Sequence, residues 1–320
     1  MTTNSLRCLV LEKMDMDYNI FSDILRYSPH LTHLSLAKFD IVPPALSRSG
    51  NLPPFTSPSV RTLTASIQQV LHLGSLDLPE SYPPLLAHFP NLIIWNIPLI
   101  EFLNADIKPT LAHALHHAVN TYSPLLTDLE FRWGTTGLVH SLLAGAFSGV
   151  RLRRIGFTNH RSKGKCGIDG MMPGILNHAD SIVSVTLSAF IPNPDNDPTL
   201  PRSPHLDASN TMFAKLMRSC PRLQTLVIPH YTVSIEAFEH GEEWACKELE
   251  TLCVNIRGLD SADSCLTKLK DLRNSDIWRT SDEVEVKGET VDDRIIQKLI
   301  GLRHLRSVWL GTKDVYLPTI

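Results

Sequence analysis

One short pattern of residues recurs along almost the whole chain and limits what it can fold into. The pattern is an apolar residue, two residues of any kind, a second apolar residue, one residue of any kind and a third apolar residue. This phrase begins at Leu6, Leu31, Val60, Leu92, Leu126, Leu152, Ile182, Leu223, Leu249 and Leu305. The starts are roughly 25 to 41 residues apart, with one longer gap of about 56, and such a period is typical of stacked repeats. A unit this short cannot bury its apolar side alone, so neighbouring units must share one core.

Proline precedes several of these phrases. It stands at Pro29, Pro58, Pro90, Pro124 and Pro221, just ahead of a phrase in each case. Because proline disfavours the helical conformation at the residue before it, a helix should end there and a strand begin. Helix-compatible runs lie upstream of these stops, at residues 18–27, 84–89, 109–122 and 206–220. The repeating unit is therefore predicted to be strand, turn and helix.

Units of this kind are expected to chain into an α/β horseshoe of about ten irregular repeats, with a parallel sheet on the concave face and helices on the convex face. Within each phrase the fourth and sixth residues should point into the core and the third, fifth and seventh should line the concave face. This lining is mostly small and polar. The residues that stand out in it, and that we predict to bind a partner, are Asp128, Glu130, Arg132, Arg154 and Trp309. Exposed aromatic residues are typical interface anchors, so Trp133 and Tyr231, just past predicted strand ends, are further candidates unless they pack between repeats.

Irregular segments interrupt the repeats without creating a second domain, so residues 1–320 should form a single repeat domain. Proline-rich stretches at about 43–58 and 192–205 cannot continue a helix or strand and are expected to be surface loops. The longest gap contains an acidic insertion at about 260–300, which should include a helix from about Val291 to Ile300.

Composition narrows the function classes. With 320 residues, 43% apolar residues and a net charge of −3, the chain can bury a large core but has no overall field that would recruit nucleic acid or an anionic membrane. No stretch is long and apolar enough to span a bilayer, and we expect an intracellular protein, cytoplasmic or nuclear. The six cysteines follow no metal-site or disulfide spacing, so they are expected to be structural thiols.

The candidates for chemistry are weak. His113 and His117 are spaced to share a metal ion on a helix, but no glutamate stands between them as in a zinc-protease motif, which favours a surface role. The segment from Arg151 to Lys165 holds six basic residues and no acid, which suits binding of a phosphate, a nucleic acid or an acidic peptide. The alternation of faces and the lack of interleaved aromatic residues favour instead a solvated face or a salt-bridge partner for Asp128 and Glu130. The glycines at 164, 167 and 170 do not follow the order of a phosphate-binding loop. We predict no catalytic residue, no cofactor and no metal, and therefore no enzyme.

The phrase Cys220-Pro221-Arg222-Leu223-Gln224-Thr225-Leu226 resembles the cysteine-containing leucine-rich repeats of F-box proteins. The stretches 244–259 and 302–311 are similar to the ends of the large fungal F-box and leucine-rich-repeat families. The resemblance implies a leucine-rich repeat horseshoe, a ribonuclease-inhibitor-like solenoid. It also implies the substrate-binding part of a ubiquitin ligase receptor. Because the first phrase begins at Leu6, we expect no F-box within this chain, and a ligase adaptor would be a partner only if an F-box lies outside it.

Two functions of different class follow from the sequence. The first is a non-catalytic protein-recognition module that binds a protein substrate or partner on its concave strands. The alternative is nucleic-acid or phospholigand binding through the Arg151–Lys165 basic cluster, whose affinity would fall steeply with salt.

Overall fold

A computed structural model describes residues 5–42, 55–71, 84–98, 109–132, 136–159, 170–189, 206–207, 210–239, 243–259, 262–274 and 290–310. The chain forms two compact units, Met1–Leu152 and Arg153–Ile320. Each unit is an α/β structure in which parallel strands alternate with helices, as the repeated phrase predicts. That residues 1–320 form a single domain stays a prediction. The predicted loop at 192–205 and most of the one at 43–58 lie outside the described residues.

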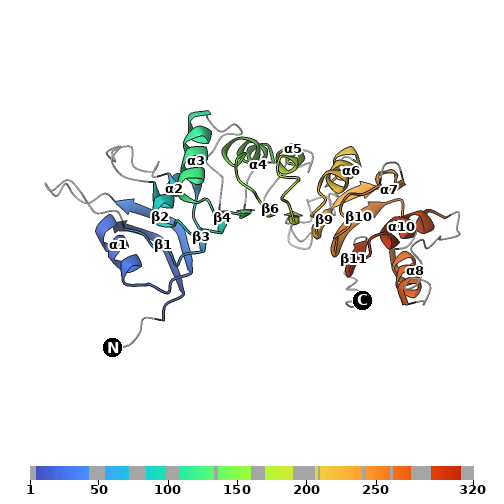
Figure 1. Ribbon diagram of the computed structural model, residues 1–320, viewed down its shortest axis with the longest axis horizontal. Helices are drawn as coiled ribbons and strands as arrows, with labels where there is room; N and C mark the ends of the chain where they lie inside the picture. Colours follow the sequence, from blue (N-terminus) through green and yellow to red (C-terminus); the bar gives the residue numbers. More distant parts are fainter. Residues whose placement is uncertain are drawn as a thin grey trace, which may run out of the picture. The chain divides into compact units, whose positions relative to one another are not determined.

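The first unit contains five strands that pair in chain order, each parallel to the next. Its elements are β1 (Cys8–Asp17), α1 (Tyr18–Arg26), β2 (His33–Val42), β3 (Thr62–Thr64), α2 (Ile67–Val70), the 3-10 helix η1 (Leu85–His88), β4 (Ile94–Pro98), α3 (Pro109–Tyr122), β5 (Asp128–Arg132), α4 (Thr136–Ser141) and the π-helical turn η2 (Leu142–Ala146). Helices α2, α3 and α4 lie on one side of this sheet (Figure 1).

The second unit continues the same alternation. Its elements are β6 (Arg154–Asn159), α5 (Met172–Leu176), β7 (Ser184–Ala189), β8 (Leu206–Asp207), α6 (Asn210–Ser219), β9 (Thr225–Ser234), α7 (Glu236–Glu239), β10 (Thr251–Arg257), α8 (Ala262–Asn274), α10 (Val291–Ile300) and β11 (Ser307–Leu310). The strands pair in the order β6, β7, β9, β10 and β11, all parallel, and the short β8 pairs with β9. The predicted helix at 206–220 is therefore wrong at its start, where β8 lies. The predicted helices at 109–122 and 291–300 are confirmed.

The apolar positions of the phrase form the core of both units. From the second phrase onward, the first residue of every phrase is at most 2% exposed: Leu31, Val60, Leu92, Leu126, Leu152, Ile182, Leu223, Leu249 and Leu305. The fourth and sixth residues of these phrases are buried as well. Since successive side chains of a strand point to opposite faces, the third and fifth residues point away from this core, as predicted.

Within each unit, a repeated hydrogen-bond motif links successive repeats. The backbone carbonyl of the second phrase residue accepts two backbone N–H groups from the following repeat. In the first unit, the Arg7 carbonyl accepts from Thr32 and His33 at 2.9 and 3.0 Å, and the Ile93 carbonyl accepts from Thr127 and Asp128 at 3.0 and 3.1 Å. In the second unit, the carbonyls of Arg153, Val183, Gln224 and Glu250 accept in the same way. We call this series the carbonyl ladder; it fixes the register of neighbouring repeats at the turn that precedes each strand.

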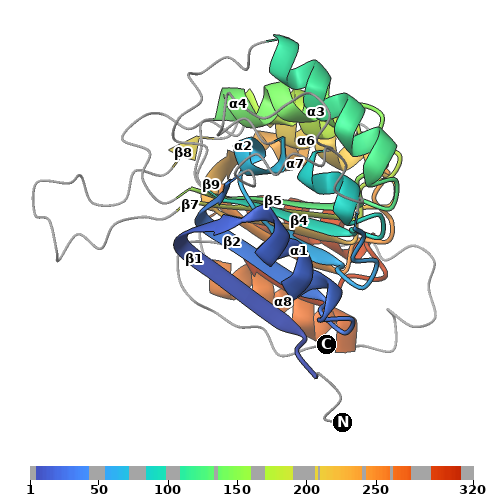
Figure 2. The same ribbon diagram turned by 90° about the vertical axis from the view of Figure 1, so that its left-hand side faces the viewer.

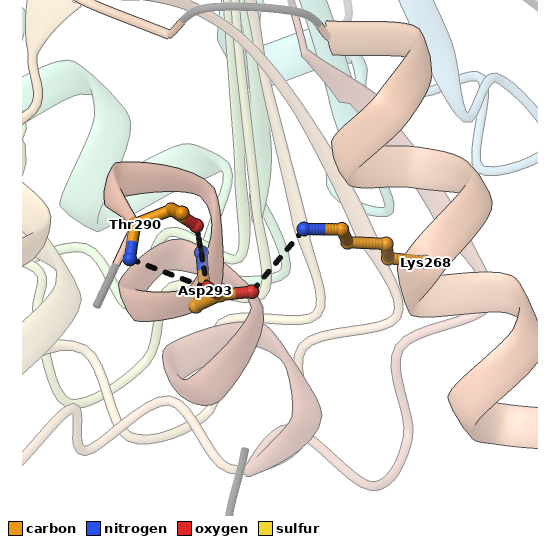
Figure 3. Close-up of polar contacts among 3 residues, drawn as sticks. All are labelled: Lys268, Thr290 and Asp293. Carbon is orange, nitrogen blue, oxygen red and sulfur yellow. Dashed lines mark hydrogen bonds and ion pairs between the residues drawn. The ribbon is translucent and has the colours of Figure 1, made fainter. Parts of the chain in front are cut away.

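The acidic insertion contains two packed helices. Helix α8 contacts both α10 and β11. At the start of α10, the Thr290 hydroxyl accepts from the Asp293 N–H at 3.3 Å, and the Asp293 carboxylate accepts from the Thr290 N–H at 3.3 Å. Lys268 of α8 donates to the same carboxylate at 3.4 Å (Figure 3). The hydrogen bond from the Thr290 side chain, and less strongly Lys268, lower the pKa of Asp293. Through these contacts the Asp293 carboxylate caps α10 and also links α10 to α8. Residues 275–289 of the insertion lie outside the described part.

Candidate functional site

The candidate site is the sheet face that points away from the helices, which we call the helix-free face. In the first unit it lies opposite α2, α3 and α4 (Figure 2). Parallel pairing brings its side chains into two rows that cross the strands from β1 to β5. The first row is Cys8, His33, Thr62, Ile94 and Asp128, and the second is Val10, Ser35, Thr64, Asn96 and Glu130. Most of the side chains in these two rows are short.

Charge on the described part of the first helix-free face is concentrated on β5. Glu130 and Arg132 stand two residues apart on the same face, and the Arg132 Nε donates to the Glu130 Oε1 at 3.0 Å. Both side chains keep substantial exposure, so this ion pair remains available to a partner. Asp128 is only 6% exposed, which makes it less accessible than its place in the phrase suggested. Beside β5, the Asn96 amide donates to the Thr64 hydroxyl at 3.2 Å and orders the middle of the row.

The second unit has a helix-free face of the same construction. One row is Arg154, Ser184, Thr225, Thr251 and Ser307, and the next is Gly156, Thr186, Val227, Cys253 and Trp309. Arg154 is exposed on β6, and Trp309 is half-buried on β11 at the other side of the unit. The hydroxyl-bearing residues between them give a polar strip with little charge. Arg154 and Trp309 are thus the two large side chains on an otherwise short-chained surface.

Hydrogen bonds hold the polar side chains of the second face in place. The Thr158 and Ser188 hydroxyls lie 3.3 Å apart on paired strands, and the Asn255 amide donates to the Thr232 hydroxyl at 3.0 Å. Cys253, which is in register with Trp309, is 6% exposed, and burial raises the pKa of its thiol to about 11. A thiol that stays protonated at neutral pH is a poor nucleophile, so Cys253 acts here as a packing residue.

The aromatic residues near the predicted face, with Trp244 included, fall into three groups: those that pack in the core, one that lies outside the described residues, and one that stays on the helix-free face. Tyr231 was predicted to lie just past a strand end, and this is wrong: it lies within β9 and is fully buried. Trp244 is 5% exposed and packs edge to face against Phe213 and Phe238. Trp133 lies outside the described residues. Among these candidates, Trp309 is the described aromatic that remains on a strand of the helix-free face.

Half of the basic cluster can be placed. Arg151, Arg153 and Arg154 are exposed at the start of β6. The other members, Arg161, Lys163 and Lys165, lie outside the described residues, as do the glycines at 164 and 167. The arrangement of the whole Arg151–Lys165 segment therefore stays a prediction.

Two of the three histidines of α3 face outward. His113 and His117 are exposed, and the His116 Nδ1 lies 3.2 Å from the Ala146 carbonyl of η2. Across the described ranges, no group of three or more histidine, cysteine, aspartate or glutamate side chains is arranged to hold a metal ion. In the same part of the chain, no helix combines the length and apolar character that crossing a membrane requires.

Comparison of the sequence with protein-family models and with curated proteins finds no match. The repeat-like α/β architecture thus stands on the pattern of residues and on the structure.

Proposed function

We propose that this chain is a non-catalytic protein-recognition module that binds a partner protein on its helix-free strand faces. The observation that supports this most is the pair of in-register rows on each face, where short side chains surround a few large ones. Rigid surfaces with a few large aromatic or arginine side chains suit protein recognition, because such residues carry most of the binding energy at interfaces. Arg132, Arg154 and Trp309 have that role in this proposal, with Glu130 orienting Arg132.

The resemblance of the sequence to fungal F-box proteins suggests a biological setting for this activity. In it, the chain is the substrate-binding repeat region of an F-box-type ubiquitin ligase receptor, and the recognised protein is the substrate. Docking on the ligase adaptor would require an F-box outside these 320 residues. The chain alone is therefore expected to bind substrate and not adaptor.

Charge reversal on the helix-free faces tests the proposal. The variants are Glu130→Lys, Arg132→Glu and Arg154→Glu, and the matched control is Lys215→Glu, which reverses an exposed charge on helix α6. Tagged chains are incubated with lysate of the cells that produce the protein, and bound proteins are quantified by mass spectrometry. We expect at least one protein to be retained by the parent chain and the control and lost from the strand variants. Retention of every bound protein by all variants would place recognition elsewhere.

The second candidate is binding of nucleic acid or a phospholigand, which the three exposed arginines at the start of β6 favour. Its signature is an affinity for oligonucleotide that falls steeply between low and physiological salt, because phosphate contacts release counterions. Binding that is absent at low salt, or that does not change with salt, rejects this candidate without affecting the first.

A further inference from the structure

Helix α3 of the first unit carries two exposed histidines that are one helical turn apart. His113 and His117 are both exposed, whereas Leu115 and Val119 of the same helix are fully buried. Residues four positions apart lie on one side of a helix, with their Cβ atoms about 5–6 Å apart. The two imidazole rings therefore project into solvent from the same side of α3.

The third histidine of the helix is engaged elsewhere. The Nδ1 of His116 lies 3.2 Å from the Ala146 carbonyl of η2, and the Asn120 amide nitrogen lies 3.2 Å from the same ring nitrogen. In the described part of the chain, neither His113 nor His117 takes part in a hydrogen bond or an ion pair. The ring nitrogens of these two residues are thus available to a ligand.

The helix holds the pair on a firm backbone without nearby charge. Both residues lie at least four positions from either end of Pro109–Tyr122, away from the ends where helices fray. The helix contains no aspartate, glutamate, lysine or arginine. The same is true of η1 and η2, the short helices that contact α3. No charged residue of these three helices therefore repels an incoming cation or holds the imidazoles in an ion pair.

The residues between the two histidines affect catalysis but not metal binding. In the zinc-protease motif, two histidines spaced by four positions on a helix hold the zinc ion, and a glutamate between them is the general base. Alanine, leucine and histidine occupy the three positions between His113 and His117. The missing glutamate removes the base of that hydrolytic chemistry, but it leaves both nitrogen ligands in place.

We propose that His113 and His117 form a two-histidine site for a divalent transition-metal ion such as Zn²⁺. Each imidazole supplies one nitrogen about 2.0–2.1 Å from the zinc, and the other positions of the tetrahedral ion are open to water. Imidazole nitrogen suits zinc, copper and nickel, whereas magnesium and calcium prefer oxygen ligands. This site departs from the expectation, drawn from the sequence, that the chain holds no metal.

The metal site does not depend on the function proposed above. Helix α3 lies on the opposite side of the first sheet from the helix-free face (Figure 2). An ion held by His113 and His117 links two successive turns of α3. Because such an ion binds the folded helix, it should favour the closed helix over its locally opened forms.

Zinc titration of the full chain, produced without a polyhistidine tag, tests the site. Isothermal titration calorimetry gives the number of Zn²⁺ ions bound per chain and their affinity. His113→Asn and His117→Asn each remove one ligand and keep a neutral polar side chain. We expect each variant to weaken one zinc site about tenfold or more, and the double variant to do no more than either, because a chelate needs both nitrogens.

Two further histidine variants serve as controls. His30→Asn changes an exposed histidine outside α3, and His116→Asn removes the ring that lies against Ala146. Both should leave the zinc affinity within about twofold, since surface substitutions away from a site have small effects. Zinc should slow hydrogen exchange of the α3 amides in the parent and in both controls, and not in His113→Asn or His117→Asn.

Three results would overturn the proposal. The first is the absence of saturable Zn²⁺ binding by the parent chain. The second is unchanged zinc binding by the double variant, which would assign the ion to other residues. The third is weaker binding in only one of His113→Asn and His117→Asn, which would show that the two rings do not share an ion. Both residues are exposed, so the variants should fold, and circular dichroism checks that they do.

Discussion

Trp95 links two repeats of the first unit through both packing and a hydrogen bond. Its side chain is fully buried on β4, and its indole Nε1 donates to the backbone carbonyl of Ala65, just after β3, at 2.9 Å. The ring also packs edge to face against Phe147, with centroids 5.9 Å apart. The hydrogen bond and the ring contribute separately to stability, and two substitutions can distinguish their contributions.

Trp95→Phe keeps an aromatic ring near Phe147 but removes the donor to Ala65. A buried carbonyl that loses its partner costs about 1–3 kcal/mol, so this variant should lose about that much free energy of unfolding. Trp95→Ala also empties the ring site, and removal of a buried tryptophan typically costs about 3–5 kcal/mol. Because domains of ordinary stability unfold with about 5–15 kcal/mol, the alanine variant should lose a large part of the free energy of unfolding and the phenylalanine variant a smaller part.

Urea denaturation followed by far-ultraviolet circular dichroism measures both effects. The urea midpoint should fall in the order parent, Trp95→Phe, Trp95→Ala, with little change in slope for the phenylalanine variant. Leu125→Ala, at a position 48% exposed in the same unit, is the control and should change the free energy of unfolding by less than about 0.5 kcal/mol. A Trp95→Phe variant as stable as the parent would refute the hydrogen bond to Ala65, and a Trp95→Ala variant no worse than Leu125→Ala would refute burial of the ring.

Further predictions concern the second unit. Burial raises the pKa of the Cys220 thiol to about 12 and that of Cys246 to about 11, so the native state holds these protons more tightly than the unfolded chain does. The contribution of these two thiols to stability is complete below about pH 9 and is lost as the pH rises toward 11 to 12. The midpoint of thermal unfolding should fall over this pH range. In a Cys220→Ala, Cys246→Ala double variant the midpoint should fall less over the same range. Thr290→Ala removes the cap of α10 and should cost about 0.5–2 kcal/mol, seen as faster hydrogen exchange in that helix, whereas Thr290→Ser should behave as the parent. Gly258 has a φ of 92°, a backbone conformation that alanine adopts only with strain. Alanine stabilises a protein at unstrained glycines, but Gly258→Ala should lower the free energy of unfolding by about 1 kcal/mol, measured by urea titration.

The parts of the fold that depend on local pattern could be predicted from the sequence. Alternation along a strand determined which phrase residues are buried, and it also placed Glu130 and Arg132 on the same face, where they form an ion pair. The helix at Pro109–Tyr122 was predicted with its observed bounds because proline suits its first turn and another proline follows its end. Each of these inferences needs only residues close together in the chain.

Features that depend on distant partners could not be predicted. The phrase predicted that the strand ends before Tyr231, yet β9 continues to Ser234. Its register with β10 shifts after Ile228, and β8 pairs with the added part. That shift buries Tyr231 instead of exposing it. His88 gives a second case: it resembles a surface residue of a short helix, but it is 1% exposed. Its ring stacks on that of Phe55 with centroids 4.1 Å apart, and its Nε2 lies 3.3 Å from the hydroxyl of Tyr18, 70 positions away in the chain. No local signal in the sequence reports these pairings.

Under the proposed function, the construction of the helix-free faces determines how a partner can be selected. The carbonyl ladder fixes the strands, so the backbone cannot adjust much to a ligand, and specificity must come from side chains. Serine and threonine on these faces lose little rotamer entropy on binding and also contribute little area. The long side chains of Arg132 and Arg154 and the ring of Trp309 must then supply most of the contact energy. It follows that enlarging a short residue in a row, as in Thr186→Trp, should weaken binding of a partner to that face as much as removing the ring of Trp309. On a flexible surface, the backbone would move to accommodate the larger side chain and binding would change less.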